Sequence, residues 1–272
     1  MIISADARQF YKEMNIGTAK PDKQNLQEVE HHFIGNLSIT ENYDVGKYEK
    51  DVLKLLDHLF TIHECVILCG GSGLFIKAVI EGLDHLPATD PEIRKSLQQK
   101  LISNGIESLQ IILKEVDPEY YANSDIQNPN RLIRALEVYF ASGQPISSFH
   151  KQEPVKRNFK SIKICLDLER KELYNRINER TEMMFNSGLL KEAEQLYPYK
   201  NLNALQTVGY KELFDFFEDK YDLRIAKELI KQNTRHYAKR QITWFKREEF
   251  KWIGASSLDE MLNYVLFNMS DD

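Results

Sequence analysis

The sequence predicts an α/β protein in which a parallel sheet core is interrupted by an all-helical insertion and continues into a helical C-terminal part. Three observations support this fold class. Two short apolar runs, at residues 1–6 and 65–69, each lead into a polar or glycine-rich segment, as strands do where they enter loops. The segment from residue 92 to about residue 143 has helical periodicity throughout. A further β-rich segment, at residues 161–168, follows that helical block.

The first two predicted strands lead directly to residues that can carry chemistry. The first strand ends at Asp6, within the sequence SADARQ at residues 4–9. Residues 44–62 follow as an amphipathic helix, and residues 65–69 form a short buried strand. The glycine-rich run 70–73 comes next, and a helix resumes immediately after it. Strand, glycine turn and helix make an α/β unit, in which ligands gather at the carboxyl ends of the strands.

The insertion is bounded by changes in composition. Pro87 and Pro91 break the apolar pattern at its start, and a basic, polar stretch at residues 151–160 ends it. We expect residues 161–168 to return to the same parallel sheet. The predicted domains are therefore an α/β core at 1–86 and 156–272, and a helical insertion at 87–155. The last hundred residues are mostly helical, with a short aromatic strand at residues 250–253.

Composition excludes several classes of protein. Hydrophobic residues make up 42% and charged residues 28% of the 272 residues, which are ordinary values for a globular chain. No apolar run is long enough to span a membrane and the N-terminus has no secretory pattern, so we expect a cytoplasmic protein without membrane contact. Cys65, Cys69 and Cys165 are expected to be free, buried thiols. The net charge of −5 argues against indiscriminate nucleic-acid binding but leaves room for a local basic surface.

Two of the candidate residues lie at predicted strand ends, and each has two interpretations. Asp6 can act as a base at the carboxyl end of a strand, or it can be the N-cap of a helix. Gly70 and Gly71 can expose amides to an anion, or they can allow close packing between a strand and a helix. The adjacent His31 and His32 point in different directions and lack neighbouring ligands, so we predict no protein metal site.

Basic residues form three further candidate groups. Arg131 and Arg134 are one turn apart near the start of a helix, where they can meet phosphates or form a solvated face. Arg176 and Arg180 have the same spacing on a later helix and can reach a cleft or form surface ion pairs. Residues 231–251 carry seven Lys and Arg against two Glu, with aromatic residues interleaved, which indicates either a nucleic-acid surface or a charged helix face.

Several of these segments together resemble one family, the tRNA dimethylallyltransferases of bacteria. The sequence ISADARQFY at residues 3–11, GGSGLFIKA at 70–78, NRLIRALEV at 130–138 and TRHYAKRQITWF at 234–245 are similar to segments of that family in the same order. Shorter matches occur at residues 16–21, 31–32, 90–94 and 208–212. The resemblance covers nearly the whole chain and implies a P-loop-kinase-like core.

The resemblance also implies an activity, substrates and site residues. The activity is transfer of a dimethylallyl group from dimethylallyl diphosphate to the N6 amine of the adenosine 3′ of the anticodon, by a monomer. Asp6 is expected to be the general base, and Arg180, with a Mg²⁺ ion, to assist departure of diphosphate. Gly70, Gly71 and Arg180 are expected at the diphosphate. The positions that resemble contacts to the tRNA anticodon stem-loop are Asp6, Ala7, Arg8, Gln9, Ser72, Arg94, Asn130, Arg131, Leu132, Ile133, Arg134, Lys239 and Arg240.

One part of the family pattern differs. The family carries, upstream of the strand that resembles residues 3–6, another strand and a P-loop of the pattern G-x-x-x-x-G-K-[ST]. This sequence has no such motif, because its one Gly-Lys pair, Gly46-Lys47, is followed by Tyr48. We therefore expect the chain to lack that segment. The alternative to an active transferase is a catalytically impaired or dead homologue that still binds tRNA. A nucleoside kinase or an adenylate isopentenyltransferase is disfavoured by the large helical insertion.

Overall fold

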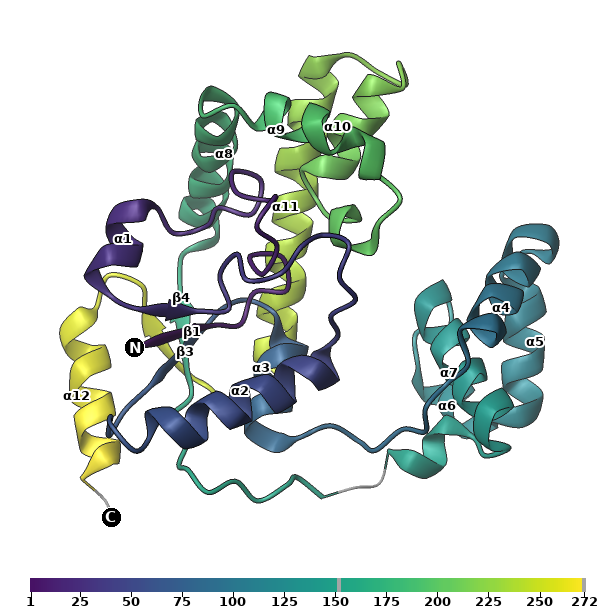
Figure 1. The fold of residues 1–272 in the computed structure, drawn as a ribbon, viewed down its shortest axis with the longest axis horizontal. Helices are drawn as coiled ribbons and strands as arrows, with labels where there is room; N and C mark the ends of the chain where they lie inside the picture. The colour runs from purple at the N-terminus through teal and green to yellow at the C-terminus, as the bar shows by residue number, and fades with distance from the viewer. Residues whose placement is uncertain (151–152, 271–272) are drawn as a thin grey trace. The chain divides into compact units, whose positions relative to one another are not determined.

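The computed structural model describes residues 1–150 and 153–270, and it divides the chain into two compact units (Figure 1). The core unit consists of Met1–Ile80 and Arg157–Asp272, and the helical unit consists of Glu81–Lys156. The sequence placed the start of the insertion at residue 87, six residues later. The structure contains, within its described residues, no helix that is long and apolar enough to cross a membrane.

Three parallel strands form the first sheet of the core unit, in the order β2-β1-β3. They are β1 (Ile2–Ser4), β2 (His31–His32) and β3 (Ile67–Cys69). Ser4 lies opposite Cys69, so β1 and β3 end side by side at the same edge of the sheet. The amide of Ala5 then donates to the carbonyl of Cys69 at 2.8 Å. This confirms the predicted strands at the first and second apolar runs.

The second sheet contains β4 (Ile164–Asp167) and β5 (Lys251–Gly254), which are also parallel. The prediction that residues 161–168 rejoin the first sheet is therefore wrong, because β4 pairs only with β5 among the described strands. Both sheets nevertheless share one hydrophobic core, in which Cys165 and Trp252 pack with Ile3 and Leu68. A strand's own sequence encodes its extended backbone and not the identity of its partner.

Helices cover the sheets and extend beyond them. Asp44 caps the helix that begins at Val45 by accepting the amide of Lys47 at 2.9 Å. Asp222 caps the helix that begins at Leu223 by accepting the amide of Ile225 at 2.8 Å. The helices of the core unit are α1 (Lys23–Glu28), α2 (Val45–Leu59), α3 (Gly73–Glu81), α8 (Arg170–Asn186), α9 (Leu189–Leu196), α10 (Tyr210–Phe217), α11 (Leu223–Phe245) and α12 (Leu258–Met269).

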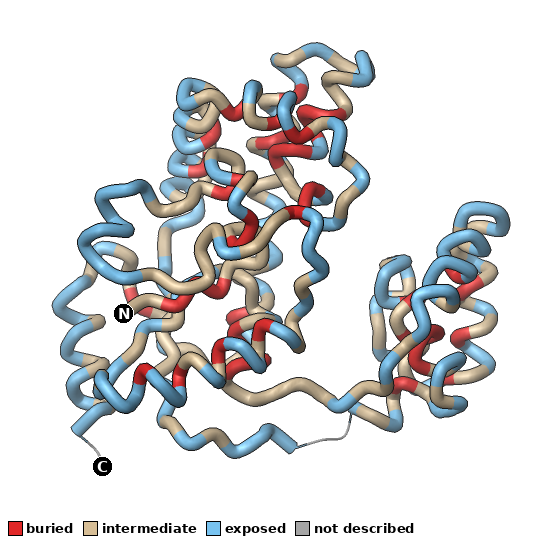
Figure 2. The backbone as a smooth tube through the Cα atoms, in the orientation of Figure 1, coloured by how far each residue is buried: buried red, intermediate tan, exposed pale blue. Residues whose placement is uncertain are grey.

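Two buried clusters stabilise the core unit (Figure 2). One lies between the sheet and α2, where Tyr48, Val52 and Leu56 pack with Ile3 and Phe10. Tyr48 also donates its hydroxyl to the carbonyl of Ser4 at 2.8 Å, which attaches α2 to the end of β1. The other cluster joins α9, α10 and α11 to residues 11–16. The chain that follows β1 is therefore fixed from both sides.

The helical unit contains α4 (Pro91–Asn104), α5 (Glu107–Val116), α6 (Pro118–Asn123) and α7 (Pro129–Ser142), followed by a 3₁₀ turn at Ile146–Phe149. Three of these helices begin with the same local signal, a proline preceded by Asp90, Asp117 or Asn128, whose side chain accepts an amide of the first turn. Leu109, Leu113, Leu132 and Leu136 are among the residues of its separate hydrophobic core.

The cysteines differ from expectation. All three are free, but Cys65 and Cys69 are exposed and Cys165 is only partly covered, so the prediction of buried thiols is wrong. The reason is the place of β3 at the outer edge of its sheet, where Ile67 is 56% exposed. A short apolar run predicts a strand equally well whether it becomes a central or an edge strand.

Candidate active site at the carboxyl ends of β1 and β3

Asp6 follows β1 directly and has one carboxylate oxygen held by the backbone. Its Oδ1 accepts the amide of Arg8 at 2.8 Å and the amide of Gln9 at 3.3 Å. The other oxygen, Oδ2, forms no hydrogen bond with the described residues, and the side chain is partly exposed. Asp6 thus caps a turn and not the start of a helix, so the helix N-cap interpretation is wrong, and Asp6 still presents a free carboxylate oxygen.

Ser72, which directly precedes α3, lies beside this turn. The amide of Ala7 donates to Ser72 Oγ at 3.0 Å, and the amide of Ser72 donates to the carbonyl of Ala5 at 3.2 Å. The structure therefore brings together Asp6, Ala7 and Ser72, which the sequence had singled out from two separate segments.

The glycine run between β3 and α3 is closely packed. A Cβ atom on Gly70 would lie 2.3 Å from the Ala5 carbonyl oxygen, and one on Gly71 would lie 2.0 Å from Gln241 Nε2. One on Gly73 would lie 2.2 Å from Trp244 Nε1. Close packing thus explains these glycines. Within the described residues, the amides of Gly71 and Gly73 donate to no other group, so an anion can still bind them.

The long helix α11 contributes residues from one face to the same place. Gln241 Nε2 donates to the carbonyl of Gly71 at 2.9 Å, and Tyr237, one turn earlier on the helix, lies near Ser72 and Asp6. Burial raises the pKa of Tyr237, so its hydroxyl stays protonated at neutral pH. In the sequence, Tyr237 is only one of the aromatic residues interleaved in the basic stretch at 231–251. Its four-residue spacing from Gln241 was the available signal.

The side chains of Arg8 and Gln9 are engaged inside the protein. Arg8 Nη1 donates to the carbonyl of Asn203 at 2.9 Å. Gln9 Nε2 donates to the carbonyls of Thr18 and Ala19, each at 3.2 Å, and its Oε1 accepts the hydroxyl of Ser4. These contacts hold the loop that carries Asp6. The amides of Arg8 and Gln9 already donate to Asp6, so only the exposed edges of both side chains are left for a substrate.

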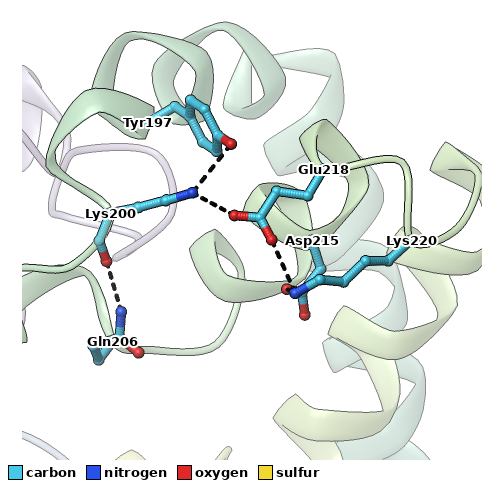
Figure 3. Close-up of polar contacts among 6 residues, drawn as sticks. All are labelled: Tyr197, Lys200, Gln206, Asp215, Glu218 and Lys220. Carbon is cyan, nitrogen blue, oxygen red and sulfur yellow. Dashed lines mark hydrogen bonds and ion pairs between the residues drawn. The ribbon is translucent and has the colours of Figure 1, made fainter.

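A chain of polar contacts supports the segment that receives Arg8 (Figure 3). Lys200 contacts Glu218 and donates to the hydroxyl of Tyr197 at 3.2 Å, while Gln206 Nε2 donates to the carbonyl of Lys200 at 2.6 Å. Glu218 also pairs with Lys220 at 2.9 Å. The pKa of Glu218 is lowered to about 2 by its hydrogen bonds to the two lysines. Asn203 lies between Lys200 and Gln206, so the segment that receives Arg8 is fastened at both ends.

Arg180 differs from the arginine one turn before it. Arg176 Nη2 pairs with Glu172 at 2.6 Å, whereas Arg180 is exposed on α8 and has no hydrogen bond or ion pair with the described residues. Lys239 and Arg240 are exposed on α11, where the Arg240 guanidinium lies 5.7 Å from the centre of the Tyr237 ring.

The basic stretch at residues 231–251 is partly neutralised by the protein. Lys231 pairs with Glu182 at 2.7 Å and with Glu228 at 2.8 Å, and Arg235 Nη1 donates to Asn178 at 2.8 Å. The seven positive charges counted in the sequence are therefore not all available to a partner.

In the helical unit, a buried carboxylate organises two of the predicted RNA contacts. Glu137, whose side chain is 2% exposed, accepts Arg94 Nη1 at 3.1 Å and pairs with Arg134 Nη1 at 3.6 Å. Arg131, by contrast, is exposed and pairs with none of the described residues. Arg94 and Arg134 thus stabilise the unit, and Arg131 is free to bind a phosphate.

The remaining predicted RNA contacts of α7 differ in how far their side chains are buried. Asn130 is exposed at the start of α7. Leu132 and Ile133 are 0% and 2% exposed and belong to the core of the helical unit, so only their backbone can reach an RNA.

Comparison with known proteins places the chain in a family. Residues 9–248 match the model of the IPP transferase family. The tRNA dimethylallyltransferase of Christiangramia forsetii is 54% identical over 252 residues, which are 92% of this chain and 83% of that protein. The enzyme of the same name from Flavobacterium johnsoniae is 49% identical over 276 residues, covering 98% of this chain and 89% of that protein.

Solved structures agree with this assignment. The full-length tRNA isopentenylpyrophosphate transferase from Bacillus halodurans is 30% identical, with a TM-score of 0.69 over 98% of this chain and 87% of that one. A eukaryotic dimethylallyltransferase acting on tRNA, at 21% identity, has a TM-score of 0.78 over 98% of this chain and 70% of that one, and shows the fold alone. The fold is accordingly the P-loop-kinase-like α/β fold that the resemblance implied. The chain belongs to the IPP transferase family, among the tRNA dimethylallyltransferases.

Proposed function

We propose that this protein transfers a dimethylallyl group from dimethylallyl diphosphate to the N6 amine of the adenosine 3′ of the anticodon in tRNA. One observation carries the proposal at the level of the site. Asp6 lies at the carboxyl end of β1 with Oδ1 held by two amides and Oδ2 free, directly beside Ser72. A carboxylate fixed in this way can receive a proton at a defined position.

The reaction explains why a carboxylate is needed. The lone pair of the adenine amine is delocalised into the ring, so the amine attacks carbon only if a base removes a proton as the new bond forms. The N6–C bond forms while the C–O bond to diphosphate breaks, and its electron pair leaves with the diphosphate oxygen. Asp6 Oδ2 takes the N6 proton and afterwards releases it to solvent.

The departing diphosphate requires positive charge or hydrogen-bond donors where negative charge develops. Arg180 is our candidate cation, because it is exposed and forms no ion pair with the described residues, unlike Arg176. The amides of Gly71 and Gly73, at the start of α3, are our candidate donors. These assignments rest on the positive charge and exposure of Arg180 and on the two amides that donate to no other described group.

Mg²⁺ is the expected companion of the diphosphate, whose charge it would neutralise. The described residues contain no group of three or more His, Cys, Asp or Glu side chains that could hold a metal ion. Every step given above uses the protein's own groups.

For the RNA, we propose that the helical unit meets the anticodon arm through Arg131 and Asn130, and that Lys239 and Arg240 of the core unit contact phosphates. All four are exposed. Because Arg94 and Arg134 already pair with Glu137, we expect Arg131 to contribute most of the salt-dependent affinity of the helical unit.

The experiment that tests this function is a single-turnover assay with an anticodon stem-loop and dimethylallyl diphosphate, with the product identified by mass spectrometry of the nucleosides. Asp6→Asn keeps the size of the side chain and removes the base, and should lower the rate by about 10²–10⁴-fold with little change in RNA affinity. Asp259→Asn, at the exposed start of α12, is the matched control.

Two outcomes would contradict the proposal. An Asp6→Asn rate within about threefold of the parent would remove Asp6 from the role of base, given the size of general-base effects. Stem-loop binding without any product from the parent protein would favour the catalytically impaired tRNA-binding homologue.

A further inference from the structure

We propose that Gln241, on α11, is a positioning residue for the candidate base Asp6. It acts through Ser72, whose backbone and side chain hold the residues on either side of Asp6. The inference rests on the proposed function and adds what places the base. Gln241 is not among the site residues that the resemblance to a family implies.

Asp6 is flanked by two residues that are both bonded to Ser72. The amide of Ser72 donates to the carbonyl of Ala5 at 3.2 Å, and Ser72 Oγ accepts the amide of Ala7 at 3.0 Å. Both contacts use backbone groups of the Asp6 turn, and such groups cost free energy when they are buried without a partner. Ala5 is fully buried. The place of Ser72 therefore determines where the backbone of Asp6 lies.

The peptide bond that joins Gly71 to Ser72 is held at both of its polar ends. Its carbonyl, which belongs to Gly71, accepts Gln241 Nε2 at 2.9 Å. Its amide, which belongs to Ser72, is the group that donates to Ala5. A peptide unit is planar, so a contact that fixes the carbonyl also fixes the direction of the amide. Gln241 thus orients the amide that binds the residue before Asp6.

The glycine run is shaped for this contact. A carbonyl oxygen only accepts, so the amide nitrogen of Gln241 must face Gly71. A Cβ atom on Gly71 would lie 2.0 Å from that nitrogen, and glycine is what lets the side chain approach. Trp244, one turn further along α11, packs against Gly73, where a Cβ atom would lie 2.2 Å from its Nε1. The helix therefore stays against the glycine run when the Gln241 amide alone is removed.

Two sets of contacts then share the task of placing the carboxylate. The amides of Arg8 and Gln9 orient Asp6 Oδ1 within its own turn. The contact from Gln241 places that turn relative to the glycine run. Proton transfer depends steeply on position, and a displacement of about 1 Å can cost about 10²-fold in rate.

The first test is Gln241→Met, which nearly keeps the length of the side chain and removes its donor. In the single-turnover assay with saturating stem-loop and dimethylallyl diphosphate, the rate should fall by about 10–10²-fold. Stem-loop affinity and the concentration of dimethylallyl diphosphate that gives half of the maximal rate should change little. Gln232→Met is the matched control, since Gln232 is exposed on the same helix and has no hydrogen bond with the described residues.

Double variants test whether the effect passes through Asp6. In an Asp6→Asn background, Gln241→Met should lower the rate little further, because the base that it places is already gone. Gly71→Ala should displace the Gln241 amide from the other side and lower the saturated rate in the same way. The Gly71→Ala, Gln241→Met pair should be no slower than the slower single variant.

Hydrogen exchange measured by NMR follows the placement itself and needs no product. In Gln241→Met, the amides of Ser72 and Ala7 should exchange about 3–10-fold faster than in the parent, the size of one net hydrogen bond. In Gln232→Met they should exchange at the parent rate.

These measurements separate the inference from the proposed function. If the parent binds stem-loops without turnover, the proposed reaction fails, while faster exchange in Gln241→Met still supports the placement of Asp6 by Gln241. Unchanged exchange at both amides overturns the inference whether or not product forms. A full further loss of rate in the Asp6→Asn background, or a change confined to the half-saturating concentration of dimethylallyl diphosphate, also overturns it, because Gln241 would then act on another part of the site.

Discussion

Tyr210 donates its hydroxyl to Glu192 Oε1 at 2.7 Å, and Glu192 also accepts three consecutive backbone amides, those of Asn15, Ile16 and Gly17, at 2.9–3.0 Å. One carboxylate on α9 thereby attaches the loop after β1 to α10. This loop continues from the turn that carries Asp6, so the contact secures the site from a distance. A Cβ atom on Gly17 would lie 2.6 Å from the Tyr210 ring, which shows how closely the parts approach.

Glu192→Ala should destabilise the protein strongly, because it leaves three amides and a hydroxyl without their acceptor. Each such partly buried group costs about 1–3 kcal/mol when its partner is lost, and relaxation of the loop will recover part of the sum. We expect a decrease of about 3 kcal/mol in the free energy of unfolding, measured by urea denaturation. Glu194→Ala, two residues away and exposed, is the control. Equal stability of the two variants would show that the loop does not depend on Glu192.

Arg131→Ala should weaken stem-loop binding and leave stability unchanged, because Arg131 is exposed and unpaired among the described residues. The slope of log K against log[salt] should become shallower by about 0.7–0.9, the contribution of one phosphate contact. The measurement is a salt titration of affinity. An unchanged slope would exclude a phosphate contact at this position.

Arg94→Ala should show the opposite pattern. Removing Arg94 takes one of two cations from Glu137, which is buried. Loss of a partner from a buried carboxylate costs about 1–3 kcal/mol, so thermal unfolding should shift downward while the salt slope changes less than in Arg131→Ala. A full loss of one phosphate contact without a change in stability would contradict the role assigned to Glu137.

Arg180→Gln should lower the single-turnover rate and raise the concentration of dimethylallyl diphosphate that gives half of the maximal rate. The reason is loss of a cation where the leaving diphosphate accumulates charge, an effect of the order of 10²-fold for one such donor. Arg176→Gln, one turn earlier on α8 and paired with Glu172, should change the rate little. Similar effects of the two variants would remove Arg180 from the proposed role.

The thiols of Cys65 and Cys165 should react at very different rates. Burial and the charge of Asp167 raise the pKa of Cys165 to about 11, so at pH 8 about one thiol in a thousand is ionised there. Cys65 is exposed and should be labelled by iodoacetamide first. The rate at Cys165 should rise about tenfold per pH unit up to about pH 11, because only the thiolate reacts. Peptide mapping measures both sites, and equal rates at pH 8 would contradict the burial of Cys165.

The sequence by itself determined the local structure around the candidate site. The strand before Asp6, the glycine turn before α3 and the proline-led helix starts at Asp90 and Asn128 all depend on residues within a few positions of one another. Such features follow from backbone hydrogen bonding and side-chain periodicity, which a short segment encodes completely. The resemblance to a family added expected roles for residues such as Asp6 in advance of any geometry.

Tertiary structure decided which of these residues meet. Ala7 and Ser72 are 65 positions apart, and Gly71 and Gln241 are 170 positions apart, yet both pairs form hydrogen bonds. The pairing of β4 with β5, and the exposure of Cys69 on an edge strand, likewise depend on where distant segments lie. The physical reason is that strand pairing, burial and charge neutralisation depend on which groups surround a residue in space. Those groups come from segments that are distant in the sequence, and the residues next to it in the chain do not specify them.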